Sequence, residues 1–85
     1  MSVTTIEVGH VYRGKNLYQT REGFVNDRGV LWISDDGQTV QYDSPSVRMG
    51  GRYPKVSREA FLNWAGSDVT DELPAAEWAT WESIL

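Results

Sequence analysis

The sequence predicts a small, mainly β fold, in which an antiparallel meander bends into a barrel and one or two short helices follow. The clearest strand signal is residues 30–33, a continuous run of β-branched and aromatic side chains. Asp36-Gly37 separates this run from the alternating residues 38–42, which indicates a hairpin. The length of 85 residues leaves room for one core, so we expect a single folded unit.

The strands before this hairpin are predicted from weaker patterns. Residues 2–8 can form a first strand or a loose arm, and residues 9–13 indicate a short strand. A second strand is expected over residues 18–26, although its pattern is polar apart from two residues. Residues 26–29 are typical of a turn, in which Gly29 would adopt a positive φ.

The residues after the hairpin alternate in polarity. Val40 and Tyr42 would therefore lie on one face of a strand. One proline and a pair of glycines favour a loop over residues 44–52, and residues 53–56 can add a short edge strand. Aromatic side chains should fill much of the core of so small a barrel: Tyr12, Phe24, Trp32, Tyr42, Phe61 and Trp64.

A short helix is expected to end the barrel domain, which we assign to residues 1–66. Ser57 is typical of a helix N-cap, the helix would cover about residues 58–65, and Gly66 would stop it. Phe61 and Trp64 lie on one face of this helix and should pack on the sheet.

Residues 67–85 are expected to form an acidic, helical extension packed on the barrel. Pro74 suits the first turn of a helix, in which Trp78, Trp81 and Leu85 would share one face. The charge is uneven along the chain. Residues 1–65 hold eight basic and seven acidic side chains, whereas residues 66–85 hold five acidic and no basic ones.

This extension has three interpretations. Its indoles can complete a core that the barrel alone cannot fill, because large aromatic side chains favour burial. It can instead act as a ligand-like helix, with indoles that enter a groove on a partner and carboxylates that meet basic residues there. In the third interpretation it covers the basic loop of its own chain and competes with nucleic acid.

Short motifs along the barrel resemble those of a known group of proteins. They are Gly9-x-Val11-Tyr12-Arg13, Val40-x-Tyr42 and Phe61-x-x-Trp64-Ala65. Together they are similar to motifs of small phage and prophage proteins that resemble Src-homology-3-like barrels and have no established activity. The resemblance covers about residues 9–65. It implies a barrel and a phage or prophage origin, and it assigns no functional residue.

The composition argues against an enzyme. The absence of cysteine removes disulfides, thiol nucleophiles and cysteine-zinc sites, and a single histidine, His10, cannot form a two-imidazole zinc site. Asp35-Asp36 lacks the spacing of a calcium loop and suits an ordinary turn. We therefore expect no catalytic residue, metal or cofactor. No apolar run is long enough for a membrane helix and no leader is evident, so we expect a cytoplasmic protein without a membrane contact.

A basic cluster in the second half of the chain could bind nucleic acid. Its members are four basic residues and one tyrosine: Arg48, Arg52, Tyr53, Lys55 and Arg58. The basic side chains would follow a phosphate backbone while the tyrosine stacks on a nucleobase. The simpler interpretation is a solvated loop. The net charge of −4 also opposes contact with a polyphosphate, unless the acidic extension lies away from it.

The main functional hypothesis is a non-enzymatic phage or prophage protein that binds another macromolecule. It would inhibit or modulate a host nucleic-acid-handling complex, including antidefence roles such as blocking a CRISPR effector, in the host cytoplasm. The expected contact residues lie in the extension: Asp68, Asp71, Glu72, Glu77, Trp78, Trp81 and Glu82. The alternatives are a nucleic-acid-binding barrel that uses the basic cluster and a structural or assembly protein.

Overall fold

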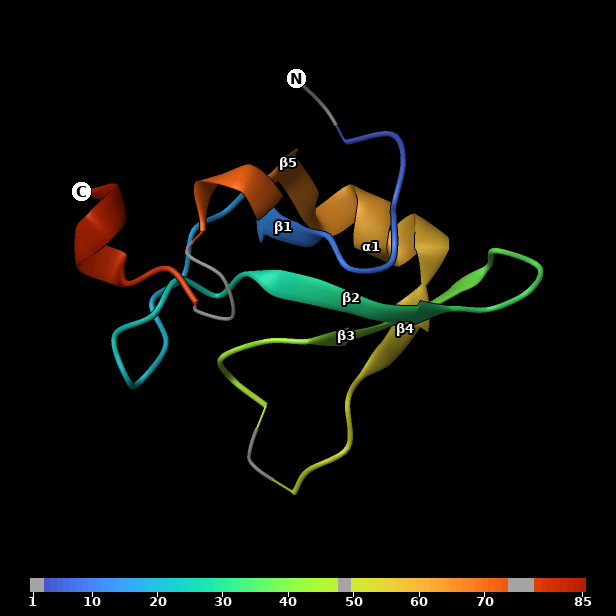
Figure 1. The fold of residues 1–85 in the computed structure, drawn as a ribbon, viewed down its shortest axis with the longest axis horizontal. Helices are drawn as coiled ribbons and strands as arrows, with labels where there is room; N and C mark the ends of the chain where they lie inside the picture. The colour runs from blue at the N-terminus through green and yellow to red at the C-terminus, as the bar shows by residue number, and fades with distance from the viewer. Residues whose placement is uncertain (1–2, 48–49, 74–77) are drawn as a thin grey trace.

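Five antiparallel strands form one sheet in the computed structural model, which describes residues 3–47, 50–73 and 78–85. The order across the sheet is β4-β3-β2-β1-β5, so the last strand pairs with the first (Figure 1). The bounds are Val11–Gly14 (β1), Arg28–Ile33 (β2), Thr39–Asp43 (β3), Lys55–Ser57 (β4) and Ala65–Asp68 (β5). The predicted mainly β class is confirmed.

The hairpin between β2 and β3 forms where the sequence predicts it. Ile33 pairs with Val40, and the Ser34 amide donates to the Thr39 carbonyl at 2.9 Å. Gly37 has a φ of +74°, a backbone angle that residues with a Cβ rarely adopt. The carboxylate of Asp36 accepts from the Ser34 hydroxyl at 2.6 Å and from the Gln38 amide at 3.0 Å, and this closes the turn.

A bulge in β2 changes which of its side chains face inward. Val30 pairs with Tyr42, but Trp32 pairs with Gln41, so the register shifts between the two β2 residues. Trp32 therefore shares a face with Gln41 and not with the buried Tyr42. The prediction that Trp32 belongs to the core is wrong, because its side chain is 43% exposed.

The segment before β2 differs from the prediction. The expected strand over residues 18–26 is reduced to an isolated bridge between Gln19 and Val25. The expected turn at residues 26–29 is wrong as well, because β2 already begins at Arg28. Asp27 is fully buried, and its pairing with Arg13 draws this stretch into the fold. A tertiary contact thus overrides the local turn signal.

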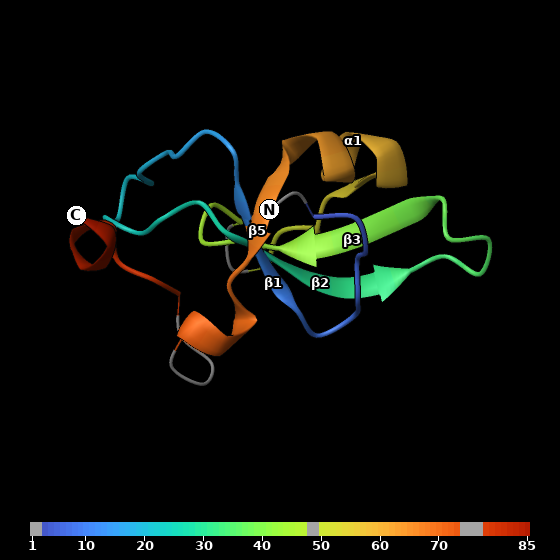
Figure 2. The same cartoon turned by 90° about the horizontal axis from the view of Figure 1, so that it is seen from above.

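The helix α1 (Arg58–Trp64) starts and ends close to the expected positions. Its N-cap is Ser57, whose hydroxyl accepts from the Ala60 amide at 3.0 Å. Gly66 does not open a loop, because β5 follows α1 directly and contains this glycine. Figure 2 shows α1 beside the sheet, where the side chain of Phe61 is completely buried.

The core lies between the bent sheet and α1. Its buried members come from the N-terminal segment, from α1 and from every strand except β4: Ile6, Tyr12, Val30, Val40, Tyr42, Phe61 and Ala65. The rings of Tyr12 and Phe61 meet edge to face at 5.6 Å. The segment before β1 is not a strand but is tied down, since Ile6 is buried and the Glu7 amide donates to the Tyr12 hydroxyl at 2.8 Å.

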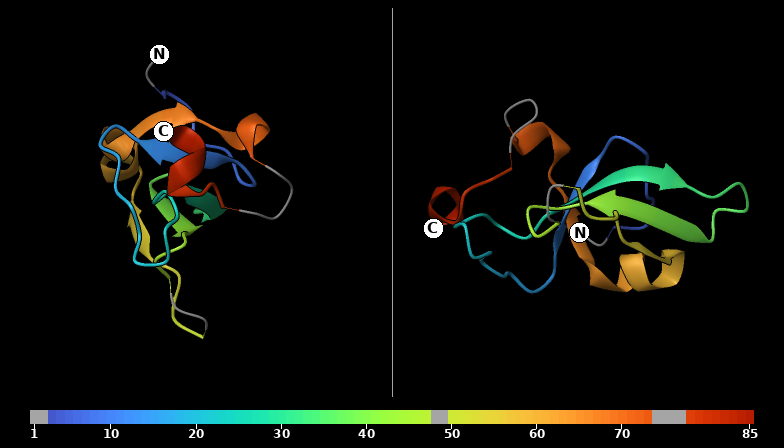
Figure 3. Two further views of the ribbon diagram at one scale, coloured as in Figure 1. Left: turned by 90° about the vertical axis from the view of Figure 1, so that its left-hand side faces the viewer. Right: turned by 90° about the horizontal axis from the view of Figure 1, so that it is seen from below.

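The C-terminal part contains two short 3₁₀ helices, η1 (Thr70–Glu72) and η2 (Trp81–Ile84). The expected amphipathic α-helix does not form in the described residues 78–85, because residues 78–80 are not helical and only the 3₁₀ helix η2 follows them. Thr80 is extended and forms a bridge with Phe24. The first turn of the expected helix, residues 74–77, lies outside the described residues. The Val25 amide donates to the Ala79 carbonyl at 2.9 Å, which holds this segment on the loop before β2 (Figure 3).

Within the described ranges, no helix is long and apolar enough to cross a membrane.

Candidate binding surfaces

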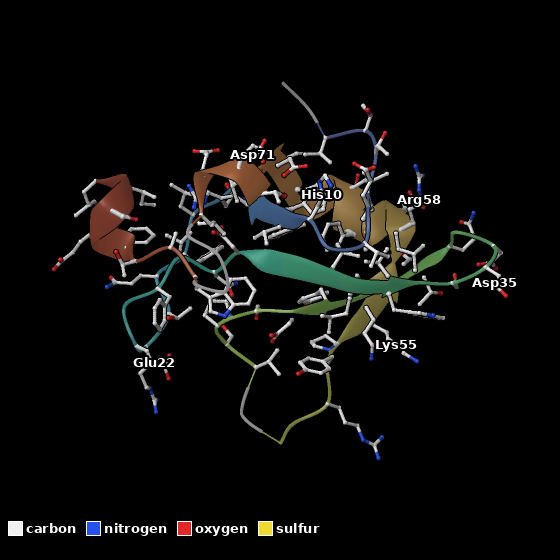
Figure 4. The ribbon with its side chains drawn as sticks, viewed as in Figure 1. His10, Glu22, Asp35, Lys55, Arg58 and Asp71 are labelled. Atoms are coloured by element: carbon white, nitrogen blue, oxygen red, sulfur yellow. The ribbon has the colours of Figure 1, made fainter. Side chains whose placement is uncertain are left out.

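One side of the molecule gathers carboxylates around His10. The carboxylates that act on His10 are those of Glu7, Asp68 and Asp71. Glu72 follows Asp71 at the end of the short 3₁₀ helix η1, and we call these four acids the acidic edge. Asp68 ends β5, and η1 carries the next two acids. Figure 4 shows Asp71 and His10 on this side of the sheet and Lys55 on the other. The fold thus brings acids of the expected extension next to an acid of the N-terminal segment.

His10 forms the centre of the acidic edge. Its Nδ1 lies 2.7 Å from Oδ2 of Asp68, and its Nε2 lies 3.5 Å from Oε2 of Glu7. The hydrogen bond to Asp68 raises the pKa of His10, with a smaller contribution from the charge of Glu7. The two ring nitrogens point to different carboxylates, so these three residues do not converge on one metal position. Among the described residues no other acidic or histidine group is arranged to hold a metal ion.

Asp68 has a structural role within the acidic edge. Its Oδ1 accepts from the amide of Thr70 at 2.9 Å and also from the hydroxyl of that residue. The same hydroxyl accepts from the Val11 amide at 2.9 Å, which links η1 to β1. Partial desolvation raises the pKa of Asp68, but the hydrogen bonds from Thr70 and His10 outweigh it and lower the pKa below its usual value.

Asp71 and Glu72 remain available to a ligand. Both are exposed, and neither carboxylate has a hydrogen bond or salt bridge to another described residue. Their charges still act within the chain, since Asp71 contributes to the raised pKa of His10 and Glu72 to that of Arg13. They project from η1, whose start is anchored through Thr70. The two acids of η1 are therefore exposed on a short helix that is hydrogen-bonded to β1.

The other expected partner residues lie elsewhere. Glu82 is on η2, at the end of the molecule opposite the β2–β3 hairpin (Figures 1 and 2). Trp78 and Trp81 are half-buried, and a Cβ on Gly29 would lie 3.3 Å from the ring of Trp78. Glu77 lies outside the described residues. The structure therefore brings together Asp68, Asp71 and Glu72 from the expected set.

Tyr53 and Lys55 of the expected nucleic-acid cluster lie near Trp32 and form with it a second surface, which we call the aromatic-basic face. Arg52 instead lines a pocket that also contains Arg28. The Lys55 ammonium lies 5.1 Å from the centre of the Trp32 ring. Tyr53 is 46% exposed, and its carbonyl accepts from the Gln41 side chain at 3.4 Å. Arg58 is separated from this face, because it starts α1 and donates to the Thr4 carbonyl at 3.5 Å. Arg48 lies outside the described residues.

Two arginines lie inward in the fold although no sequence pattern predicts it. Arg13 forms a bidentate ion pair with the fully buried Asp27, with N–O distances of 2.9 and 3.0 Å. Arg28 instead packs on rings, with its central carbon 4.0 Å from the ring centre of Trp64 and 4.4 Å from that of Tyr42. No local pattern distinguishes these arginines from exposed ones, because their partners are distant in the sequence.

Comparison with protein-family models, curated proteins and solved structures gave no match to this chain. A function therefore has to follow from its own surfaces.

Proposed function

We propose that this protein is a non-catalytic binding module that recognises a cationic surface on another protein through the acidic edge. The observation that carries the proposal is the pair Asp71 and Glu72, two exposed carboxylates without an ionic partner among the described residues. Asp68 beside them is already engaged with Thr70 and His10. Lysines and arginines of a partner would meet the free carboxylates first.

The physical role of such a surface is mainly to guide association. Charges of opposite sign attract over roughly 10 Å at moderate ionic strength, and this attraction speeds the encounter more than it tightens the complex. A nucleic-acid-binding protein presents the cationic surface required. The resemblance to phage and prophage proteins extends the proposal to an inhibitor of a host nucleic-acid-handling complex, with an antidefence role, by steric and electrostatic blockage.

The test uses the full chain as bait in an extract of its host. Proteins retained by the wild type are identified, purified and measured for association rate. Asp71→Asn combined with Glu72→Gln should slow association about tenfold at low salt, because two guiding charges are lost. Raising the salt from about 50 to about 300 mM should slow the wild type and largely remove the difference between the proteins.

The matched control removes two acids far from the acidic edge, Asp35 at the hairpin tip and Glu59 on α1. Asp35→Asn with Glu59→Gln changes the net charge equally but should leave the association rate close to that of the wild type. Equal slowing by both double variants would show a general charge effect and would contradict a role for the acidic edge.

The aromatic-basic face supports a second candidate function, single-stranded nucleic-acid binding. The specific observation is the exposed ring of Trp32 next to Lys55, with the exposed Tyr53 nearby. Nucleobases stack on such rings while cations follow the phosphates. Lys55 lies on β4 and Asp71 follows β5, so the two residues lie at opposite edges of the sheet (Figure 4), and the acidic edge would not directly oppose the contact.

A gel-shift titration with a single-stranded oligonucleotide separates the two candidates. Point variants of the full chain are needed, because a truncation at residue 66 would cut through β5. Lys55→Gln and Trp32→Ala should each weaken binding, whereas Arg58→Gln, which removes the same charge from α1, should not. The absence of any shift with the wild type would rule out the second candidate and leave the first intact.

A further inference from the structure

A pocket of about 410 Å³ opens between the start of β2, the end of β3 and the loop that leads to β4. Among the described residues, its polar and charged lining consists of two arginines, two serines and an amide, without a carboxylate: Arg28, Arg52, Ser44, Ser46 and Asn26. Two cations without an acid in this described lining are unexpected in a chain whose net charge is −4. Its lining therefore suits an anion.

Arg28 is held in place by packing, and it has no ionic partner within the described ranges of the chain. Trp64 and Tyr42 pack against its guanidinium at 4.0 and 4.4 Å. Among the described residues, no carboxylate or other acceptor bonds to it. No buried side-chain nitrogen in the described part of the chain lacks a partner, so the nitrogens of Arg28 reach solvent. Its N–H donors are thus available to a ligand.

Arg13 differs from Arg28, because it has a structural role and an ionic partner. Its guanidinium is matched by both oxygens of Asp27. Arg28 lacks such a match, and partial burial lowers its pKa because the charged form loses hydration. A half-buried cation without a counterion costs stability, and a bound anion would offset that cost.

Other groups of the pocket add donors to the same site. Arg52 is exposed and supplies a second positive charge. The Ser46 hydroxyl donates to Oδ1 of Asn26 at 3.0 Å, which fixes the amide and leaves its nitrogen as a donor. Guanidinium groups match the oxygens of phosphate better than a monatomic ion, because several N–H groups can bond to one tetrahedral anion.

We propose that this pocket binds a phosphate group, presented as inorganic phosphate or as a phosphomonoester, with Arg28 as the fixed donor and Arg52 as the second cation. The site is separate from the acidic edge and goes beyond the proposed protein-binding function. Phosphate binding and protein binding can therefore succeed or fail independently.

The experiment is a titration of the full chain, labelled with ¹⁵N, with sodium phosphate and with phenyl phosphate, at ionic strength held constant with sodium chloride. Saturable shifts are expected for the backbone amides of Arg28, Ser44 and Ser46. Arg52→Gln should weaken binding by about tenfold, equivalent to about 1.4 kcal/mol, because an exposed cation is lost without disturbing the core. Arg28→Lys should weaken it further, since the charge stays but the planar donor is lost.

Arg58→Gln is the matched control, because it removes one positive charge from α1, outside the pocket. It should bind as the wild type does. Stronger binding of phenyl phosphate than of phosphate would assign an ester as the ligand, and the reverse would assign the free ion. The proposal is overturned if the shifts do not saturate, or if the Arg52→Gln and Arg28→Lys variants, shown by their spectra to be folded, bind as tightly as the wild type.

Discussion

Asp27 illustrates how a single residue can organise a stretch without regular structure. It is fully buried, and both of its oxygens are bonded to Arg13, 14 positions earlier. The hydrogen bond to Asp27 raises the pKa of Arg13. The pair joins the end of β1 to the start of β2, where their ladder begins with Tyr12 and Arg28. It therefore fixes the entry of the chain into β2.

Asp27→Asn should lower the free energy of unfolding by about 3 kcal/mol, because the Arg13 side chain, which is 15% exposed, loses the carboxylate to which it is bonded. Urea denaturation followed by circular dichroism measures this change. Asp35→Asn is the control, since Asp35 lies exposed at the hairpin tip, and it should change stability by less than about 0.5 kcal/mol. Similar small effects of the two substitutions would contradict the structural role of the pair.

His10 should make stability depend on pH in a defined direction. Its pKa is raised above 6.5 in the folded state, chiefly by the hydrogen bond to Asp68. The folded state thus binds the proton more tightly, so this contribution is complete below about pH 6.5 and is lost as the pH rises through the folded pKa. As the pH rises from about 6.5 through the folded pKa of His10, the urea midpoint of the wild type should fall, whereas that of His10→Gln should fall less. If an NMR titration of the imidazole gave His10 a pKa at or below 6.5, this would contradict its hydrogen bond to Asp68.

At the scale of elements, β1 and α1 approach so closely that one position must lack a side chain. A Cβ on Gly14 would lie 2.6 Å from Nε1 of Trp64 and 2.8 Å from Cε2 of the same ring. The indole cannot move freely, because it also packs on Phe61 at 5.3 Å and on Arg28. The contact between these two elements thus depends on this glycine.

Gly14→Ala should destabilise the protein by about 1–3 kcal/mol, since the added methyl group displaces the Trp64 ring. The same substitution in a Trp64→Leu background should cost less, because the clashing ring is absent. Denaturation of the four proteins gives the coupling between the two sites. Equal costs in both backgrounds would show that the clash with the ring is not the cause.

The segment before η2 should be held to the body by a few specific contacts. Ala79 is 8% exposed, its carbonyl accepts from Val25, and the Trp81 amide donates to Gly23 at 2.8 Å. Ala79→Asp should release this segment and speed hydrogen exchange at the amides of Val25 and Trp81, because a charge cannot stay buried there. Leu85→Asp, at a position 88% exposed, adds the same charge and should leave both rates unchanged.

At the scale of the whole molecule, the core joins segments from the N-terminal arm to β5. We therefore expect a single cooperative unfolding transition, with coincident midpoints for tryptophan fluorescence and far-ultraviolet circular dichroism in urea. Separate midpoints would show that part of the chain unfolds independently. In the Ala79→Asp variant the two signals should remain coincident, because Val25 and Ala79 lie outside the main core cluster.

The distribution of charge is also a property of the whole molecule. The acidic edge combines Glu7 with acids near residue 70, and the pocket at the start of β2 combines Arg28 with Arg52. Each surface joins residues that are far apart along the chain. The uneven charge of the sequence predicts an acidic C-terminal part, but not that these acids surround His10.

The sequence by itself determined the features that depend on near neighbours. The β2–β3 hairpin follows from Asp36-Gly37 between two strand patterns, and α1 follows from Ser57 and its apolar face. The inward positions of Val40 and Tyr42 follow from simple alternation. Bonds within a few residues decide these elements, so their signals are present in the local sequence.

Only the tertiary structure decided the rest. The bulge that exposes Trp32 depends on how β2 pairs with β3, and the burial of Asp27 depends on Arg13. The non-helical residues 78–80 are held on the loop at residues 23–25, where backbone hydrogen bonds replace those of a helix. Partners distant in the sequence supply these interactions, and their free energy outweighs the local preference for a turn, a helix or an inward ring.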